Sequence, residues 1–174
     1  MRKRILVAML ISSVASVLTS PTSASAEDTP VTLEVSGGTL GITVPTGPVN
    51  LGSTTVSSSP QTVSSQLGTV TVTDERGGTA DWTATANAVD FTGPSTISVS
   101  AAGSSTYTAP AATVTGTATV TSHNLSPMYP AGPVQTAANV SGINTATWNP
   151  TIAIRVPANT LVGTYTSTIT HSVS

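Results

Sequence analysis

Apolar and polar residues alternate along most of the chain beyond residue 30. Valine, isoleucine, leucine and alanine recur at every second position, and threonine fills most of the positions between them. This period of two is typical of antiparallel strands with one buried and one exposed face. It predicts strands over 31–35, 40–44, 69–73, 82–88, 97–99, 113–121, 152–156 and 165–173. No comparable stretch shows the period of a helix.

Clusters of glycine and proline separate these runs, for example at 36–38, 45–48 and 130–133. Glycine allows positive φ and proline fixes φ, so each cluster indicates a turn or loop. The stretches 53–65 and 122–142 alternate poorly, and we expect longer loops there. About eight short strands at this spacing predict an all-β fold, an antiparallel two-sheet β-sandwich with an Ig-like Greek key. A small β-barrel is the alternative.

Residues 1–26 are predicted to be a secretory signal peptide. Basic residues at 2–4 precede an apolar stretch at 5–18, and Ala-Ser-Ala at 24–26 provides a cleavage site before Glu27. The apolar stretch is short for a membrane span, and no second long apolar segment follows. An uncleaved N-terminal anchor is the alternative. We therefore expect a single domain over 27–174, secreted and then extracellular or associated with the cell wall, with no membrane span.

Removal of residues 1–26 would change the charge. The remaining chain keeps all seven acidic residues but only Arg76 and Arg155, a formal net charge of −5. So few basic residues exclude a basic nucleic-acid surface. The absence of cysteine excludes disulfides, thiolate metal sites and a cysteine nucleophile. With 34 threonines and 24 serines, the exposed strand faces should be nearly uncharged and rich in hydroxyl groups.

Few residues suggest chemistry. His123 and His171 lie far apart, and no Gly-x-Ser-x-Gly motif is present, so a small hydrolase is a remote alternative. Acidic residues at 74, 75, 81 and 90 could hold calcium, although no EF-hand spacing supports this. Asp74, Arg76 and Gly77 are better explained as a tight turn, in which Asp74 accepts from backbone amides and Arg76 pairs with an acid. We expect no catalytic residue, metal or cofactor.

Two ordered segments resemble WxL domains, which are wall-associated modules of Gram-positive bacteria. The first runs from Leu67 through the Asp-Glu-Arg-Gly turn at 74–77 to Trp82 and then Asp-Phe-Thr-Gly at 90–93. The second joins Ile-Ala-Ile-Arg-Val-Pro-Ala at 152–158 to the closing strand at 163–170. The resemblance covers about residues 67–173 and suggests a divergent, actinobacterial-type relative. In place of the two tryptophan-x-leucine signatures, the chain has Trp82-Thr83-Ala84 and His171-Ser172-Val173.

The resemblance implies a non-catalytic surface module that binds peptidoglycan without a covalent link. Its implied binding residues are those of the two signature positions, 82–84 and 171–173. The alternatives are a released adhesin or surface-assembly component that binds a protein partner, and a surface whose threonine rows bind an ordered lattice such as ice or crystalline polysaccharide. No sorting motif or apolar tail follows Val173, so we expect any retention at the envelope to be noncovalent. Burial is expected for Trp82 and His171, because each shares a face with apolar residues.

Overall fold

The computed structural model describes residues 25–174. The predicted signal peptide therefore lies, up to residue 24, outside the described residues. Val35 to Ser174 form one compact unit, and the residues before Val35 belong to a separate one. The described part of that separate unit, residues 25–34, contains no strand or helix.

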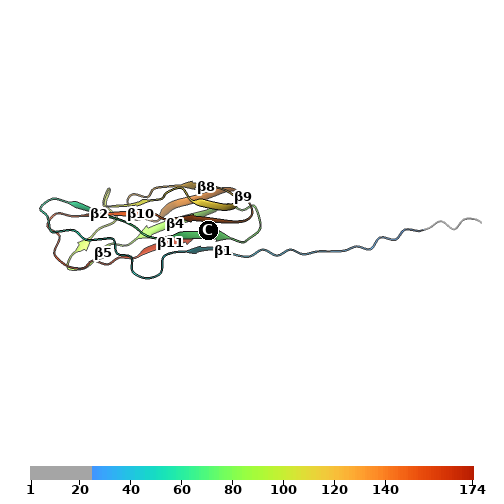
Figure 1. The fold of residues 1–174 in the computed structure, drawn as a ribbon, viewed down its shortest axis with the longest axis horizontal. Coiled ribbons are helices and arrows are strands. Elements are labelled where there is room, and N and C mark those ends of the chain that lie inside the picture. The colour runs from blue at the N-terminus through green and yellow to red at the C-terminus, as the bar shows by residue number, and fades with distance from the viewer. Residues whose placement is uncertain (1–24) are drawn as a thin grey trace, which may run out of the picture. The chain divides into compact units, whose positions relative to one another are not determined.

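The compact unit is all-β, which confirms the predicted fold class. All strand pairings are antiparallel, and no helix occurs in the described residues (Figure 1). The strands are β1 (Leu40–Thr43), β2 (Gln61–Gln66), β3 (Val70–Asp74), β4 (Trp82–Ala88), β5 (Phe91–Thr92), β6 (Thr96–Ile97), β7 (Ser105–Thr108), β8 (Thr113–Ser122), β9 (Gly132–Trp148), β10 (Thr151–Val156) and β11 (Ile169–Val173).

A six-stranded sheet forms the larger part of the fold. Its order is β1-β3-β9-β4-β11, and β8 also pairs with β9. The first half of β9 pairs with β4 and the second half with β3, while β8 follows β9 along most of its length. The edge strands β1 and β11 come close to each other, so the sheet curls into a nearly closed barrel.

Backbone irregularities accompany the curl of the long β8–β9 hairpin. The β8–β9 register shifts next to Gly116, which has a φ of 85°, and β9 contains Asn139 and Gly142 at positive φ. Bulges of this kind bend a strand and increase its twist. A Cβ added at Gly116 would overlap the carbonyl oxygen of Ile143, so the close approach of β8 to β9 depends on glycine.

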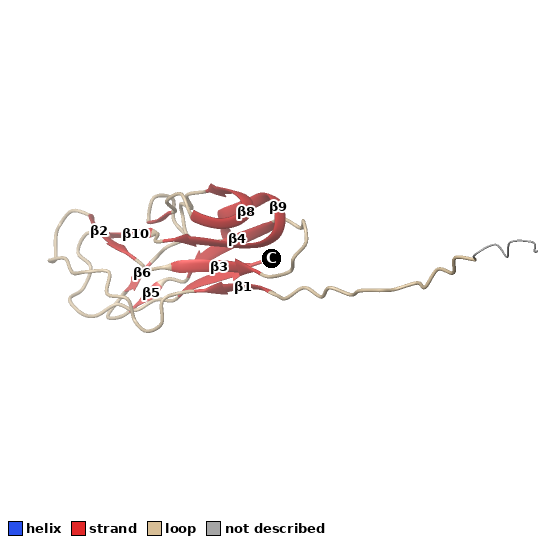
Figure 2. Cartoon of the chain, turned by 45° about the vertical axis from the view of Figure 1, so that its right-hand side comes forward, coloured by secondary structure: helices blue, strands red, loops and turns tan. Residues whose placement is uncertain are grey.

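A second sheet has the order β2-β10-β7, and β5 pairs with β6 in a short ribbon (Figure 2). Alternate residues of β3, β4 and β10 point inward, as their sequence pattern predicts. The core contains few aromatic residues and is filled mainly by small aliphatic ones. Its large, fully buried side chains include Trp82, Tyr107, Met128 and Ile152.

Several boundaries predicted from the sequence are wrong. The stretches 53–65 and 122–142, expected to be loops, contain most of β2 and the first half of β9, the longest strand. β2 has a single apolar residue, Val63, and forms by pairing with β10. In β9 the alternation is interrupted, because the neighbouring residues Val134 and Gln135 are both buried. They lie beside a register shift in the pairing with β4, and this irregularity hides the period of two in the sequence.

Other predicted strands are shorter than expected or absent. The strand expected over 165–173 begins only at Ile169. In place of the strand expected over 97–99, the structure has the two-residue strand β6, which ends at Ile97. Residues 31–35 form no strand, although they alternate clearly. A strand needs a hydrogen-bonded neighbouring strand as well as an alternating pattern. Residues 25–174 provide no such neighbour for this segment.

Candidate functional site

The two signature segments lie side by side, although almost ninety residues separate them in sequence. β4 and β11 pair antiparallel, with Val173 opposite Ala84 and His171 opposite Ala86. Backbone hydrogen bonds between Thr83 and Ser174 extend the pairing beyond the end of β11. All six residues predicted from the resemblance are therefore on one two-stranded edge of the larger sheet.

These six side chains divide between two faces. Trp82 is only 2% exposed and Ala84 is fully buried, so a polymer outside the protein cannot contact them. His171 and Val173 are half-buried on the same inward-facing side. Thr83 is half-buried on the outer face and Ser172 is exposed. Of the six, Thr83 and Ser172 are placed to contact a ligand on the outside of the sheet.

Trp82 is held by a buried polar network. Its Nε1 donates to Oδ1 of Asn144 at 3.0 Å, and Nδ2 of Asn144 donates to Oδ2 of Asp74 at 3.2 Å. The Arg76 side chain donates to both Asp74 carboxylate oxygens, at 2.9 and 3.0 Å, and its backbone N–H adds a bond at 3.1 Å. The hydrogen bond from the Arg76 side chain is the main reason that the pKa of Asp74 lies below its usual value. This geometry is that of a structural turn.

His171 belongs to a second buried cluster, between the two sheets. Its Nε2 lies 3.1 Å from the Tyr107 hydroxyl oxygen, which also accepts a 2.9 Å hydrogen bond from Nε1 of Trp148. Since the indole can only donate, the Tyr107 proton is available to His171 Nε2. Burial lowers the pKa of His171 to about 4 and raises that of Tyr107. The buried Nδ1 atom of His171 has no hydrogen-bond partner within residues 25–174.

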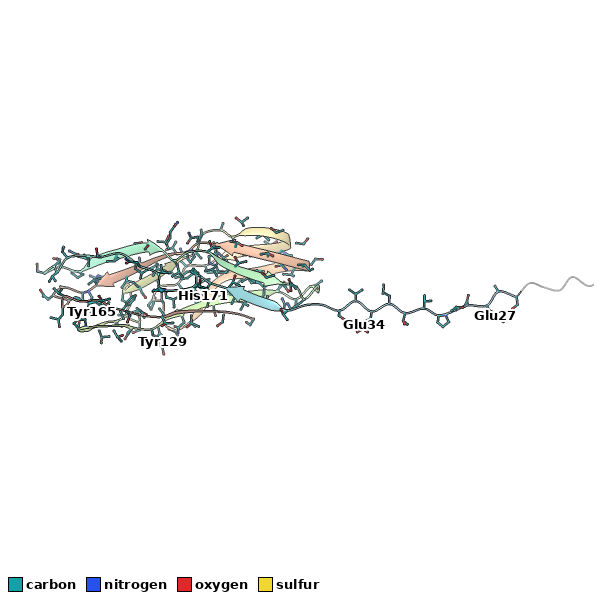
Figure 3. The ribbon with its side chains drawn as sticks, turned by 60° about the horizontal axis from the view of Figure 1, so that its bottom comes forward. Glu27, Glu34, Tyr129, Tyr165 and His171 are labelled. Carbon is teal, nitrogen blue, oxygen red and sulfur yellow. The ribbon has the colours of Figure 1, made fainter. Side chains whose placement is uncertain are left out.

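His171 also lines a groove of the compact unit with a volume of about 1120 Å³. Its walls come from the connection between β1 and β2, from the inner faces of β2 and β10, and from the irregular stretch before β11. Figure 3 shows Tyr165, another lining residue, toward one end of the unit and His171 nearer its middle. Apolar lining side chains include Leu51, Val63, Phe91, Ile154, Val156 and Ile169. None of the lining residues is an Asp, Glu, Lys or Arg.

A different surface covers the outside of the larger sheet. Two rows of residues run across β1, β3, β9 and β8, and every member except one glycine is a threonine. The first row is Thr43, Thr71, Thr147 and Thr113, and the second is Gly41, Thr73, Thr145 and Thr115. We call these threonines the threonine face. The hydroxyls of Thr71 and Thr147 lie 3.2 Å apart, and all the side chains are exposed or half-buried.

The side chains considered for catalysis or metal binding are His123, His171 and the acidic residues at 74, 75, 81 and 90. The Nε2 atoms of His123 and His171 pair with Thr136 and Tyr107, and neither histidine has a carboxylate partner within residues 25–174. In the same range, no three His, Asp or Glu side chains gather as metal ligands. Asp90, one of the suggested calcium ligands, accepts a backbone hydrogen bond from Val99 instead. No helix in this part of the chain is long and apolar enough to span a membrane.

Comparison with protein-family models, curated proteins and solved structures found no match. The features that sequence reasoning missed are the groove, the Tyr107–Trp148 pair and Asn144. Asn144 occupies an inward position of the alternating run at the end of β9, and a polar residue there is the one signal that could have been noticed. The threonine alternation was visible, but its alignment across four strands depends on the register.

Proposed function

We propose that this protein is a secreted, non-catalytic module that binds cell-wall polymer noncovalently, and that the threonine face is its contact surface. The single observation that carries this proposal is the alignment of hydroxyl groups in two rows across four strands. Each threonine hydroxyl is both a donor and an acceptor, which suits the hydroxyl and amide groups of a glycan. The resemblance of 67–173 to WxL domains agrees with the same target.

The dimensions of the threonine face favour a repeating ligand. Neighbouring strands lie about 4.8 Å apart, and residues i and i+2 of a strand about 6.6 Å apart, so the backbone positions that carry these threonines form a regular grid. A polymer can repeat one weak contact along such a grid, and linked contacts together give a useful affinity. The proposed contact thus needs no deep pocket.

The charge of the protein determines how such binding should respond to salt. The predicted mature chain has a formal charge of −5, so an anionic wall would repel it. No charged side chain points outward from the four strands of the threonine face, because Asp74 is buried. Hydrogen bonds and apolar contacts should persist at high salt, where attraction between charges is screened within about 3 Å.

Co-sedimentation with purified peptidoglycan sacculi tests the proposal. The test variant carries Thr73→Val, Thr115→Val and Thr145→Val, which remove one row of hydroxyls at nearly constant shape. The matched control carries Thr62→Val, Thr108→Val and Thr151→Val on the outer face of the β2-β10-β7 sheet. We expect the control and the unmodified protein to sediment at 0.1 and 1 M salt, and the test variant to lose at least about tenfold in affinity.

Three results would contradict this proposal. Equal sedimentation of both triple variants would show that the threonine face does not contact the polymer. Release of the unmodified protein at moderate salt would indicate electrostatic binding. Failure to sediment under any condition would favour an adhesin or surface-assembly component. Thermal unfolding of each variant establishes that it is folded before binding is compared.

A further inference from the structure

Residues 29–36 have the sequence of a strand but no partner strand within the described residues. Val31, Leu33 and Val35 alternate with Thr32 and Glu34, and the three apolar side chains are 86–91% exposed. Figure 3 shows this stretch around Glu34 as an extended chain. A row of apolar side chains beside free backbone N–H and C=O groups is the usual donor in strand addition.

An acceptor with matching properties exists in the compact unit. β2 is an edge strand of its sheet, and it pairs with β10 on one side alone within the described residues. Its inward-facing Gln61 and Val63 line the groove of about 1120 Å³, which exceeds the roughly 300–1,000 Å³ of small-molecule sites. The free edge of β2 therefore borders a large, uncharged and partly apolar space.

The chemistry of the donor fits this acceptor. If Val31, Leu33 and Val35 face the groove, the period of two places Thr32 and Glu34 on the opposite face, toward solvent. The one charge of this strand is then kept out of a groove whose lining contains no Asp, Glu, Lys or Arg. A lipid or another apolar small molecule could use the groove, but it would leave the β2 edge unpaired.

The donor segment lies too close in sequence to β1 to reach the groove of its own chain, so the donor strand must come from another molecule. Backbone hydrogen bonds between Gly38 and Glu75 and between Glu75 and Thr39 fix the chain just before β1. From Gly38, β1 leads to Val44, the first groove residue, about 20 Å away at 3.3 Å per residue. Leu33 is five residues from Gly38 and reaches at most about 18 Å. Figure 2 shows β2 at the opposite end of the unit from the start of β1.

We propose that residues 29–36 add as a strand to the free edge of β2 in a second copy of this chain, with Val31, Leu33 and Val35 in its groove. The contact joins two different surfaces, so reciprocal exchange gives a closed dimer and one-way exchange gives longer assemblies. Removal of the signal peptide before Glu27 would make this segment the N-terminus, which leaves it free to insert.

Analytical ultracentrifugation of the 27–174 protein over a concentration series is the first test. The donor variant carries Val31→Asn, Leu33→Asn and Val35→Asn, and the matched control carries Thr32→Ser and Glu34→Gln on the opposite face. We expect the unmodified protein and the control to associate, and the dissociation constant of the donor variant to rise at least about tenfold. A protein that remains monomeric up to about 1 mM, or a donor variant that associates like the control, would overturn the proposal.

Crosslinking locates the acceptor, and the absence of native cysteine makes it selective. A Leu33→Cys protein is mixed with a Val56→Cys protein, because Val56 lines the groove and is 58% exposed. A Thr117→Cys protein is the control, since Thr117 is exposed on β8 and outside the groove. A short thiol crosslinker should join Leu33→Cys to Val56→Cys and not to Thr117→Cys. Equal yields, or a monomer carrying a bound lipid in native mass spectrometry, would refute strand exchange.

Discussion

The hydroxyl oxygen of Tyr107 lies 3.1 Å from Nε2 of His171, and the two rings meet edge to face with centroids 5.6 Å apart. β7 contributes one residue and β11 the other, so this contact joins the smaller sheet to the larger one. Trp148 donates to the same hydroxyl from the end of β9. The three side chains together connect the two sheets, and the protonation of His171 should affect the stability of the whole fold.

The first prediction concerns pH. The pKa of His171 is about 4 in the folded protein and near 6.5 in an unfolded chain, so the unfolded state takes up the proton first as pH falls. The contribution of His171 to the free energy of unfolding should therefore be constant above about pH 7 and decrease between about pH 6.5 and 4, by up to about 3 kcal/mol. Urea unfolding at a series of pH values measures this. His171→Asn should flatten the slope, whereas Thr170→Asn, an exposed change on the same strand, should keep it.

The second prediction concerns Trp82. Trp82→Ala leaves a cavity in the core and should lower the free energy of unfolding by about 3–5 kcal/mol. Trp82→Phe retains most of the packing but leaves Oδ1 of Asn144 without its donor, at a cost of about 1–3 kcal/mol. Chemical denaturation checks both values, with Thr83→Ala on the outer face as a control expected to cost less than about 1 kcal/mol.

Binding data on the same variant separate the two roles of Trp82. Because Trp82 is buried, folded Trp82→Phe protein should sediment with sacculi as well as the unmodified protein. A fully stable Trp82→Phe variant that no longer binds would instead show that the indole contacts the polymer.

The third prediction compares two glycines of the β8–β9 hairpin. Both have positive φ, but a Cβ at Gly116 would overlap the carbonyl oxygen of Ile143, whereas nothing lies within 4 Å of a Cβ at Gly142. Gly142→Ala should cost about 1–2 kcal/mol through backbone strain alone. Gly116→Ala should cost clearly more, because β8 must move away from β9. Equal midpoints in thermal unfolding would show that the hairpin bend does not depend on that close approach.

The fourth prediction concerns the turn at Asp74. Arg76→Gln removes the guanidinium that satisfies the buried Asp74 carboxylate, and it should lower the unfolding temperature at neutral pH. The loss should shrink as the pH falls below about 3.8, the usual pKa of Asp. The stability that comes from the lowered pKa of Asp74 is present above that pH and disappears as the pH falls through the folded-state pKa. A scan of the melting temperature against pH for both proteins checks this. An unchanged melting temperature at pH 7 would show that the ion pair is dispensable.

The local parts of the fold were readable from the sequence because the period of two depends only on which face of a strand is buried. β3, β4, β8 and β10 lie within a residue or so of their predicted ranges. The turn at 74–77 was equally local, since Asp74 and Arg76 are two residues apart. The all-β class follows from many such runs, and it needed no knowledge of how they pair.

Pairing and register were decided only by the tertiary structure. β2 has almost no apolar pattern and exists through its hydrogen bonds with β10, and the bulges of β9 erase the alternation that would have revealed it. The same holds for the candidate sites, since the threonine rows and the Tyr107–His171 contact join residues from distant parts of the sequence. Sequence alone established which residues alternate. Long-range contacts decided which of them face the core, a groove or a free edge. Backbone hydrogen bonds can form between strands of almost any sequence, so the sequence does not show which strands pair or in what register.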